Sequence, residues 1–292
     1  MVAAQTRVRP ILGAAALALL AVLLSAQAPK PERVVSLVPS MTEALYAMGA
    51  GDTVVGVSSY DTYPPEVRSK PRVGALLDPD FERIIALKPT LVIVYATQTE
   101  LIQKLSKVGL SIFSSRHAEL SDVAASVRVL GQRIGRADKG EAVALEIERS
   151  IDDIRRAVAG RPRPKTALLF GREPGSLRSL HASAGYGFMH DMLVAAGGAD
   201  VFADVKRESL QLTTEVLLAR APEVIIEVRP SPAWTPDHLA KERAVWNALP
   251  SLPAVKANRV YILSDDRLAS PGPRVAEGVR LLARTLHPDL FK

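Results

Sequence analysis

Two segments in different halves of the 292-residue chain repeat one order of residues, and this repeat constrains the fold more than any other feature. Each segment begins with a glutamate, continues through a short apolar helix-forming stretch to a proline and ends in an apolar run; the segments are residues 82–94 and 215–227. Residues 45–52 and 193–200 form a second matching pair in the same order. Alternating helices and strands that recur along a chain predict two α/β lobes, whereas the alternative is a chance similarity between two generic helix-to-strand units.

Apolar runs and helix signals indicate the elements of the first lobe. Short strands are predicted at residues 33–38, 53–58 and 91–95. The last run is nearly all apolar, as expected for a strand that is buried on both faces of a parallel sheet. Ser40 and Glu43 have the spacing of a capping box at the start of a helix. Asp78 and Pro79 are predicted to open a further helix, with proline at its first position.

A charged helix is predicted between the two lobes, at residues 138–160. Its apolar residues follow the spacing of a single stripe: Ile147, Ile151, Ile154 and Val158. One helix between two lobes would be a stiff hinge, so we expect little opening and closing. The predicted fold is therefore α/β, with an N-terminal lobe at residues 33–137 and a C-terminal lobe at residues 161–292. Each lobe is expected to contain a central, mainly parallel sheet.

The first residues are predicted to be a targeting signal. Arg7 and Arg9 form a short basic region, residues 11–24 are an apolar run, and residues 25–28 offer small side chains for signal-peptidase cleavage. The apolar run is shorter than the ~20 residues that a membrane-spanning helix needs. We therefore expect a cleavable signal peptide at residues 1–28 and a mature protein in the periplasm. The alternative is a retained N-terminal anchor.

The composition excludes several classes of protein. The chain contains no cysteine, which rules out disulfides, thiolate metal sites, a cysteine nucleophile and a lipid-anchored N-terminal cysteine. The net charge is +6, but charges of both signs alternate and no basic run is dense enough for a nucleic-acid groove. A hydrophobic content of 48% and a charged content of 23% are typical of a globular protein.

Five segments carry a resemblance to a known family: residues 33–43, 56–65, 80–89, 215–222 and 269–274. In this order they resemble the substrate-binding proteins of ABC importers for metal chelates, a family that includes cobalamin-binding and ferric-siderophore-binding proteins. The resemblance extends over residues 33–290 and implies two α/β lobes joined by one backbone helix. It also implies a monomer that captures a metal chelate and delivers it to an ABC permease dimer in the inner membrane.

The resemblance implies a docking role for two glutamates. In this family an exposed glutamate on each lobe meets arginines of the permease, and the matching residues are Glu82 and Glu215. Two carboxylates on rigid lobes at a fixed separation suit a two-fold symmetric partner and would set the orientation of docking. Alternatively, each glutamate is a first-turn acid that stabilises its own helix through the macrodipole.

The ligand is expected between the lobes, beyond the carboxyl ends of the strands. Side chains that follow predicted strands are therefore candidates for binding it: Ser40, Tyr60, Tyr95 and Thr97 in the first lobe, and Arg172, Arg229, Asp265, Asp266 and Arg267 in the second. The resemblance implies that Tyr60 packs on a corrin ring and that Tyr95 replaces a tryptophan near it. Each tyrosine could instead be a half-buried aromatic at a strand end.

Some positions depart from the pattern of the cobalamin binders. Two tryptophans of those proteins fall near Leu76 and Ser209, and an aspartate and an arginine that bond the cobalamin periphery fall within residues 264–268 in an ambiguous register. Trp234 either compensates from the proline-rich loop at residues 230–236 or anchors that loop. The resemblance thus implies cobalamin or a related corrinoid first, with the ligand itself left open.

A ferric siderophore or haem is the alternative ligand. Arg172, Arg229 and Arg267 could pair with its carboxylates, or they could be solvated loop charges. A tyrosine or a histidine could bind haem iron, and His181 and His190 are the nearest histidines. Zinc would need about three imidazoles and a carboxylate, but the histidines have no ligand spacing; they are His117, His181, His190, His238 and His287. No covalently bound cofactor and no metal site are expected.

An exported α/β enzyme is the rival from another class of protein. The sequence contains no Gly-x-Ser-x-Gly elbow and no P-loop, and Val-Pro-Ser at residues 38–40 replaces the glycines of a dinucleotide fingerprint. We therefore expect no catalysis, and a preformed, mostly apolar cleft that binds its ligand through a few polar contacts.

Overall fold

Short apolar runs separated by amphipathic helices fold into two sheets in the computed structural model, which describes residues 32–116, 119–229 and 234–291. Residues 33–292 form one unit, distinct from residues 1–32. The predicted signal peptide at residues 1–28, His117 and residues 230–233 of the proline-rich loop lie outside the described residues. Within the described ranges, no helix is long and apolar enough to cross a membrane.

Sheet A lies in the N-terminal half and is parallel throughout. Its strand order is β2-β1-β3-β4. The bounds are β1 Val34–Ser36, β2 Val54–Val57, β3 Leu91–Tyr95 and β4 Ser111–Ser115. Side chains of β3 alternate between two cores, because Leu91 and Ile93 join one hydrophobic cluster while Val92 and Val94 join another. The nearly all-apolar sequence of β3 is thus explained by burial on both faces.

Sheet B lies in the C-terminal half and is mixed. Its strand order is β10-β9-β5-β6-β8, with β7 paired to β5. Strands β5, β7, β9 and β10 are parallel, whereas β6 runs antiparallel to both β5 and β8. The bounds are β5 Lys165–Gly171, β6 Leu180–Ala184, β7 Ala199–Asp200, β8 Arg207–Leu212, β9 Val224–Val228 and β10 Val260–Leu263. The predicted α/β fold is confirmed, with a parallel sheet A and a mixed sheet B, in which β6 pairs antiparallel with β5 and with β8.

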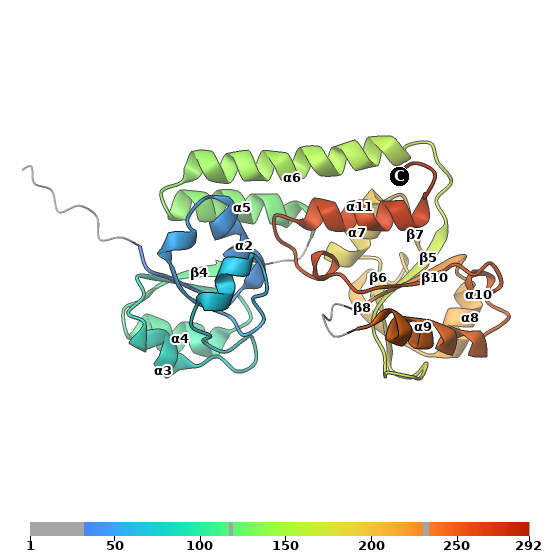
Figure 1. Cartoon of the computed structure of the whole chain (residues 1–292), viewed down its shortest axis with the longest axis horizontal. Coiled ribbons are helices and arrows are strands. Elements are labelled where there is room, and N and C mark those ends of the chain that lie inside the picture. Colours follow the sequence, from blue (N-terminus) through green and yellow to red (C-terminus); the bar gives the residue numbers. More distant parts are fainter. Residues whose placement is uncertain (1–31, 117–118, 230–233, 292) are drawn as a thin grey trace, which may run out of the picture. The chain divides into compact units, whose positions relative to one another are not determined.

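The helices cover both faces of the two sheets. Their bounds are α2 Pro39–Ala47, α3 Phe81–Ala86, α4 Thr99–Lys107, α5 Ser121–Arg133, α6 Ala137–Val158, α7 Phe188–Ala195, α8 Thr214–Arg220, α9 Pro236–Ala244, α10 Pro253–Lys256 and α11 Val275–Leu286. Helix α6 links sheet A to sheet B in sequence and packs against both α5 and α11 (Figure 1). Its predicted apolar stripe is buried: Ile147, Ile151, Ile154 and Val158.

One hydrophobic cluster runs through both halves. It joins Val34 and Leu91 of sheet A, the apolar stripe of α6, and Leu168 and Ile226 of sheet B. The opposite face of each sheet has its own cluster, which contains Ile84 under sheet A and Trp246 under sheet B. The two sheets therefore share one helical layer and one core, in addition to the covalent connection through α6.

The predicted helix-to-strand repeat is present in the structure. Helix α3 leads to β3 in one half and helix α8 leads to β9 in the other, and Glu82 and Glu215 are each the second residue of their helix. Both glutamates are exposed. The repeat in the sequence thus corresponds to equivalent pieces of two α/β halves.

Two predicted helix starts are wrong. Helix α2 begins after Val38, which has no side-chain cap, and Glu43 pairs with Arg274 instead of closing a capping box with Ser40. Helix α3 begins at Phe81 rather than at Pro79, because the carboxylate of Asp80 accepts the backbone N–H of Arg83 at 2.9 Å and caps the helix there. At α2 a tertiary ion pair takes the glutamate of the predicted capping box, and at α3 a local hydrogen bond caps the helix two residues later than predicted.

Candidate functional site

Three adjoining cavities lie where strands of both sheets end. The largest have volumes of about 620 and 660 Å³, and the smallest has a volume of about 310 Å³. All three share Tyr95, the last residue of β3. We call the three together the cleft. The first cavity is lined by Pro39, Ser40, Glu43, Tyr60, Thr62, Tyr63, Tyr95, Ser264, Asp266, Ala269, Ser270 and Pro271.

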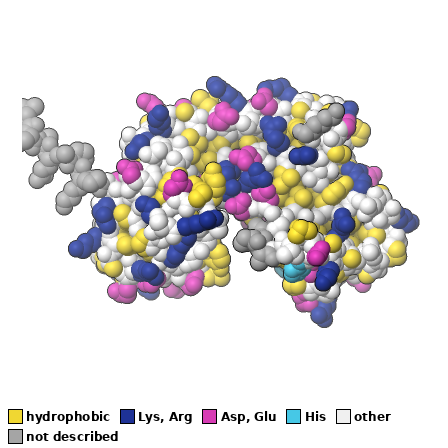
Figure 2. Space-filling model, viewed as in Figure 1, with side chains coloured by type: hydrophobic (Ala, Val, Ile, Leu, Met, Phe, Trp, Pro, Cys, Tyr) yellow, Lys and Arg dark blue, Asp and Glu magenta, His cyan; other side chains and the backbone are white. Residues whose placement is uncertain are grey.

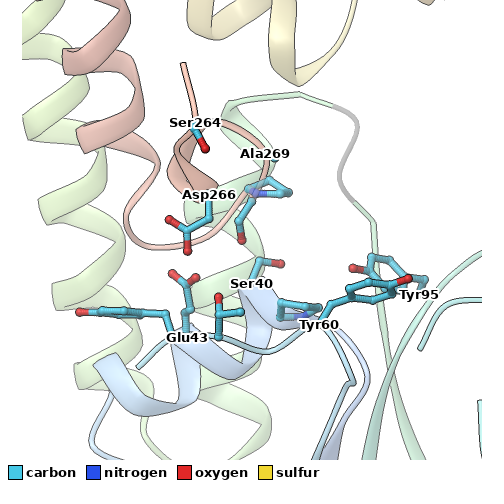
Figure 3. A pocket seen from close by; sticks show the side chains of 12 residues that line it. Ser40, Glu43, Tyr60, Tyr95, Ser264, Asp266 and Ala269 are labelled. Carbon is cyan, nitrogen blue, oxygen red and sulfur yellow. The ribbon is translucent and has the colours of Figure 1, made fainter. Parts of the chain in front are cut away.

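Figure 3 shows how the first cavity is built from the two halves. Ser40 and Glu43 come from the start of α2, whereas Ser264, Asp266 and Ala269 come from the loop after β10. The loop comes close to the helix: a Cβ atom added to Gly272 would lie 3.2 Å from the Cα atom of Ser40. A larger residue at this position of the loop would make a tight contact with the start of α2.

Tyrosines provide most of the aromatic surface of the cleft. Tyr60 is 74% exposed and Tyr63 is 42% exposed, so the ring of Tyr60 and part of the ring of Tyr63 are available to a ligand. Burial, and secondarily the charge of Asp61, raise the pKa of Tyr95 to about 12. Tyr95 is therefore a neutral phenol at ordinary pH, and its hydroxyl can donate a hydrogen bond.

An ion pair joins the two halves at the wall of the cleft. Nη2 of Arg274 lies 2.6 Å from Oε1 of Glu43, and Nε donates to Oε2 at 3.0 Å. The other edge of the guanidinium group contacts Asp266 at 3.1 Å, and its face lies over the ring of Tyr63, 3.8 Å from the centroid. Burial raises the pKa of Glu43, while the hydrogen bond from Arg274 opposes that shift. The pair is thus a desolvated, bidentate contact across the cleft.

A buried carboxyl group lies beneath the cleft. Asp61 is 2% exposed, and neither of its side-chain oxygens has a hydrogen-bond partner among the described residues. Burial raises its pKa to about 7, although polar interactions with the Thr42 side chain and the Ser58 backbone, and then the charge of Arg72, oppose the shift. The backbone carbonyl of Asp61 accepts from Arg72 at 2.8 Å, which fixes the turn that presents Tyr60 and Thr62.

The structure brings five predicted binding residues to the cleft. Ser40, Tyr60, Tyr95 and Asp266 line the first cavity. Thr97 lines the second cavity together with Tyr95. These residues follow β1, β2, β3 and β10, and they lie at the cleft as expected for residues beyond the carboxyl ends of parallel strands.

The structure does not bring Arg172 and Arg229 to the cleft. Arg172 has a fully buried side chain, 3.0 Å from Glu227 and 2.8 Å from Glu242. Arg229 pairs with the same Glu227, and Nε1 of Trp246 donates to that carboxylate at 3.2 Å. The two arginines therefore belong to a buried network under the end of sheet B.

Asp265 and Arg267 are paired with each other rather than turned to the described cavities. Nε of Arg267 donates to Asp265 at 2.8 Å, and Nη1 lies 2.8 Å from Glu277 of α11. The hydrogen bond from Arg267 lowers the pKa of Asp265. Of the predicted run at residues 265–267, only Asp266 lines the cleft.

Residues of the site that sequence reasoning misses include Glu43, Tyr63 and, behind the lining, Arg274. The capping-box spacing predicts a helix cap for Glu43, and no local signal connects it to Arg274, which lies 231 positions later. The second cavity adds Arg116, Phe188 and Glu208, which follow no predicted strand end that sequence reasoning singled out.

The described histidines are used elsewhere. Nδ1 of His190 lies 2.9 Å from Asp200, His238 stacks on Trp234 with ring centroids 4.4 Å apart, and His287 is buried. His181 lies on β6, outside the three cavities. In the part of the chain that the structure describes, no group of three or more histidine or acidic side chains could hold a metal ion.

Two α/β halves that share a helical layer and enclose a tyrosine-lined cleft at the ends of their strands define a class of ligand-binding proteins. Residues 34–267 match the family described as periplasmic binding protein. The chain belongs to this family, whose members serve ABC transporters, and its relatives are binding proteins rather than enzymes.

Two curated relatives are similar over most of their length. A substrate-binding lipoprotein of an uncharacterised ABC transporter, YvrC of Bacillus subtilis, is 30% identical over 90% of this chain and 82% of its own. A vitamin B12-binding protein of Yersinia pseudotuberculosis is 31% identical over 73% of this chain and 75% of its own.

Two solved structures of similar proteins have different ligands in their names. The periplasmic vitamin B12 binding protein BtuF of Vibrio cholerae has a TM-score of 0.75 and 26% identity, over 88% of this chain and 97% of its own. The periplasmic haem-binding protein RhuT of Roseiflexus has a TM-score of 0.75 and 27% identity, over 89% and 99%. Relatives with the same fold are therefore named after more than one chelate.

Proposed function

We propose that this chain captures cobalamin or a related corrinoid in the periplasm and delivers it, as the substrate-binding component of an ABC importer, to a permease dimer in the inner membrane. The observation that carries the proposal is the cleft: tyrosine rings and strand ends from two α/β halves surround it. Relatives that are named vitamin B12-binding proteins support the choice of ligand. The predicted signal peptide at residues 1–28 supports export.

Two tyrosines have distinct proposed roles in binding. The exposed ring of Tyr60 offers an apolar face to a flat macrocycle. The neutral hydroxyl of Tyr95 can donate a hydrogen bond to an amide at the edge of a corrin. Ser40 adds a hydroxyl group to the first cavity and Thr97 adds one to the second. Such a cleft would bind mainly through apolar surface and would orient the ligand through a few polar contacts.

Glu82 and Glu215 are proposed to dock the protein on the permease. Both are exposed second residues of short helices, α3 and α8, at equivalent points of the repeat. We take the two halves as lobes at residues 33–137 and 161–292, held apart by the helix at residues 138–160. Equivalent carboxylates on two similar lobes would match arginines on a two-fold symmetric partner.

A haem or a ferric siderophore is the second candidate ligand. A relative that is named as haem-binding supports it, and the exposed phenol of Tyr60 offers an oxygen ligand for a chelated iron. Arg172, Arg229 and Arg267 give no support, because each is paired with carboxylates of the protein itself.

Calorimetric titration of the purified protein tests the choice of ligand. Cyanocobalamin, haemin and a panel of ferric siderophores are titrated in parallel. We expect saturable one-to-one binding of cyanocobalamin, and weakening of at least tenfold in Tyr60→Ala, since loss of a stacked ring costs about 1.4 kcal/mol or more. The control is Val129→Ala, which removes a 53% exposed apolar side chain from α5. Binding of haemin or a siderophore in place of cobalamin would refute the corrinoid and leave the transport function.

A further inference from the structure

Carboxylates outnumber cations around the cleft. Among the described residues that line its three cavities, four are acidic: Glu43, Asp78, Glu208 and Asp266. One lining residue, Arg116, is basic, and Arg274, which lines none of the three cavities, pairs with both Glu43 and Asp266. In Figure 3 the carboxylate groups of Glu43 and Asp266 point toward one another, and both bond the same guanidinium group, that of Arg274.

Arg274 has little capacity left for an anionic ligand. One edge of its guanidinium group holds Glu43 through two hydrogen bonds, and the other edge contacts Asp266. Its face is covered by Tyr63. Since two carboxylates share this single guanidinium group, one unit of negative charge remains on the wall of the first cavity. The Asp266 side chain is 48% exposed and is the part of the cluster that a ligand can reach.

The other arginines at the ends of sheet B are also neutralised within the protein. Arg172 and Arg229 pair with Glu227, and Arg267 pairs with Asp265 and Glu277. Figure 2 shows basic and acidic side chains interspersed over the visible face rather than separated into patches. Arg116 shares the second cavity with Glu208, so that cavity carries one charge of each sign.

We propose that the cleft selects chelates by charge and accepts neutral or cationic ones while rejecting those that carry free carboxylates. The selection deepens the proposed function and rests on it, since it concerns the ligand of the same cleft. Asp266 is the specificity-determining residue, with Glu43 held in place behind it by Arg274. The positive N-terminal end of α2, equivalent to about half a unit charge, only partly offsets the excess.

The physical basis is the cost of bringing like charges together in a partly enclosed space. Two like charges a few ångströms apart repel more strongly in a partly solvated site than in bulk water, because the effective dielectric constant is lower there. Relaxation and salt reduce the repulsion. A weakening of at least tenfold is therefore expected when one neutral group of a ligand near Asp266 becomes a carboxylate.

Matched corrinoids provide the test. Cyanocobalamin and its monocarboxylic acids, in which one side-chain amide is hydrolysed, have the same shape and differ in charge. We expect the isomer whose acid lies nearest Asp266 to bind at least tenfold more weakly than cyanocobalamin. In Asp266→Asn this ratio should fall at least threefold, while the matched surface variant Asp204→Asn should keep it. Asp204 pairs with Arg220 and lines none of the three cavities. Equal or tighter binding of all the acids would overturn the proposal.

If no corrinoid binds, the choice of a corrinoid as ligand is refuted, but the charge selection is not. A second series of ligands then tests the charge selection. Ferrioxamine B is a cation, its N-acetyl derivative is neutral and its N-succinyl derivative is an anion, all around one ferric centre. The expected order of affinity is cation, neutral, anion, with the spread reduced in Asp266→Asn. For haem, haemin is compared with its dimethyl ester. Preference for the free propionates would overturn the charge selection while leaving a chelate-binding protein.

Discussion

Buried carboxylates in this protein are of two kinds. Glu227 is fully buried and accepts hydrogen bonds from Arg172, Arg229 and Trp246. Asp61 is also buried, but its side-chain oxygens have no hydrogen-bond partner in the described chain. The negative charge of Glu227 stabilises the folded protein because it is paired, whereas a charge on Asp61 destabilises it, because a buried unpaired ion loses its hydration. Neutralising Glu227 should therefore lower the stability of the protein, and neutralising Asp61 should raise it.

Glu227→Gln should destabilise the protein by about 3 kcal/mol or more, because it leaves two buried guanidinium groups short of negative charge. The free energy of unfolding in urea measures the effect. The control is Asp204→Asn, which removes an exposed partner of Arg220 and should cost less than about 1 kcal/mol. A change at Glu227 as small as that of the control would show that the network contributes little to stability.

Asp61→Asn should remove a pH dependence of stability. The pKa of Asp61 is about 7 in the folded protein and near 3.9 in an unfolded chain, so the folded protein binds more protons between these values. The free energy of unfolding then falls as the pH rises from about 4 to 7, by about 1.4 kcal/mol for each unit of pKa difference. The variant should match the wild type near pH 4 and exceed it at pH 8.

Urea titrations at several pH values check this expectation. The exposed Asp52→Asn should instead run parallel to the wild type at every pH. If Asp61→Asn also ran parallel to the wild type, the carboxyl group would be solvated in solution.

The sequence predicts that a residue lies at the cleft only where its place at the end of a strand is enough to put it there. Tyr60, Tyr95 and Asp266 follow strands, and the ends of parallel strands meet at one edge of the sheet. The same argument predicts Arg172 and Arg229 at the cleft, but Glu227 and Glu242 bind Arg172 from 55 and 70 positions away, and Glu227 also pairs with Arg229. A strand end fixes where a Cα atom lies and does not fix which partner its side chain finds.

At the scale of elements, helices α5 and α6 approach each other through two glycines. A Cβ atom on Gly131 would lie 2.9 Å from the Cα atom of Gly140, closer than any real contact of this kind. The helical layer that both sheets share therefore depends on a backbone-to-backbone crossing. The repeat and the stripe of α6 could be predicted because both are periodic patterns within one segment. The starts of α2 and α3 could not, because competing hydrogen bonds decide them.

Gly131→Ala should lower the free energy of unfolding by about 1–3 kcal/mol, the usual cost of overpacking. Alanine favours a helix by about 1 kcal/mol relative to glycine, so the loss would occur against the intrinsic propensity. Chemical denaturation measures it, with the exposed α6 variant Arg149→Ala as the control. A stabilised Gly131→Ala would mean that the two helices separate at little cost.

At the scale of the whole molecule, the two halves are joined three times: by α6, by the shared hydrophobic cluster and by the ion pair between Glu43 and Arg274. Each connection opposes a hinge motion. The stiffness expected from a single interlobe helix is thereby reinforced by contacts that no sequence pattern revealed. We expect X-ray scattering to give nearly the same radius of gyration with and without bound ligand, and a large decrease on binding would contradict a preformed cleft.

The docking proposal is also tested on the whole molecule. Replacing both Glu82 and Glu215 by alanine should abolish or strongly reduce uptake of the ligand while calorimetry gives unchanged binding, since neither lies at the cleft. Glu100→Ala is the matched control, because Glu100 is likewise the exposed second residue of a helix, α4. Normal uptake by the double variant would refute the docking role.

The shared core has a spectroscopic consequence. Both tryptophans, Trp234 and Trp246, lie in the C-terminal half, and Trp246 is 1% exposed. Intrinsic tryptophan fluorescence therefore reports on one half alone, whereas circular dichroism reports on the helices of both. Because one hydrophobic cluster spans the halves, the two signals should change at the same denaturant concentration. Every tryptophan-detected unfolding curve of this protein would then be a measurement of the whole of residues 33–292, including the tryptophan-free half.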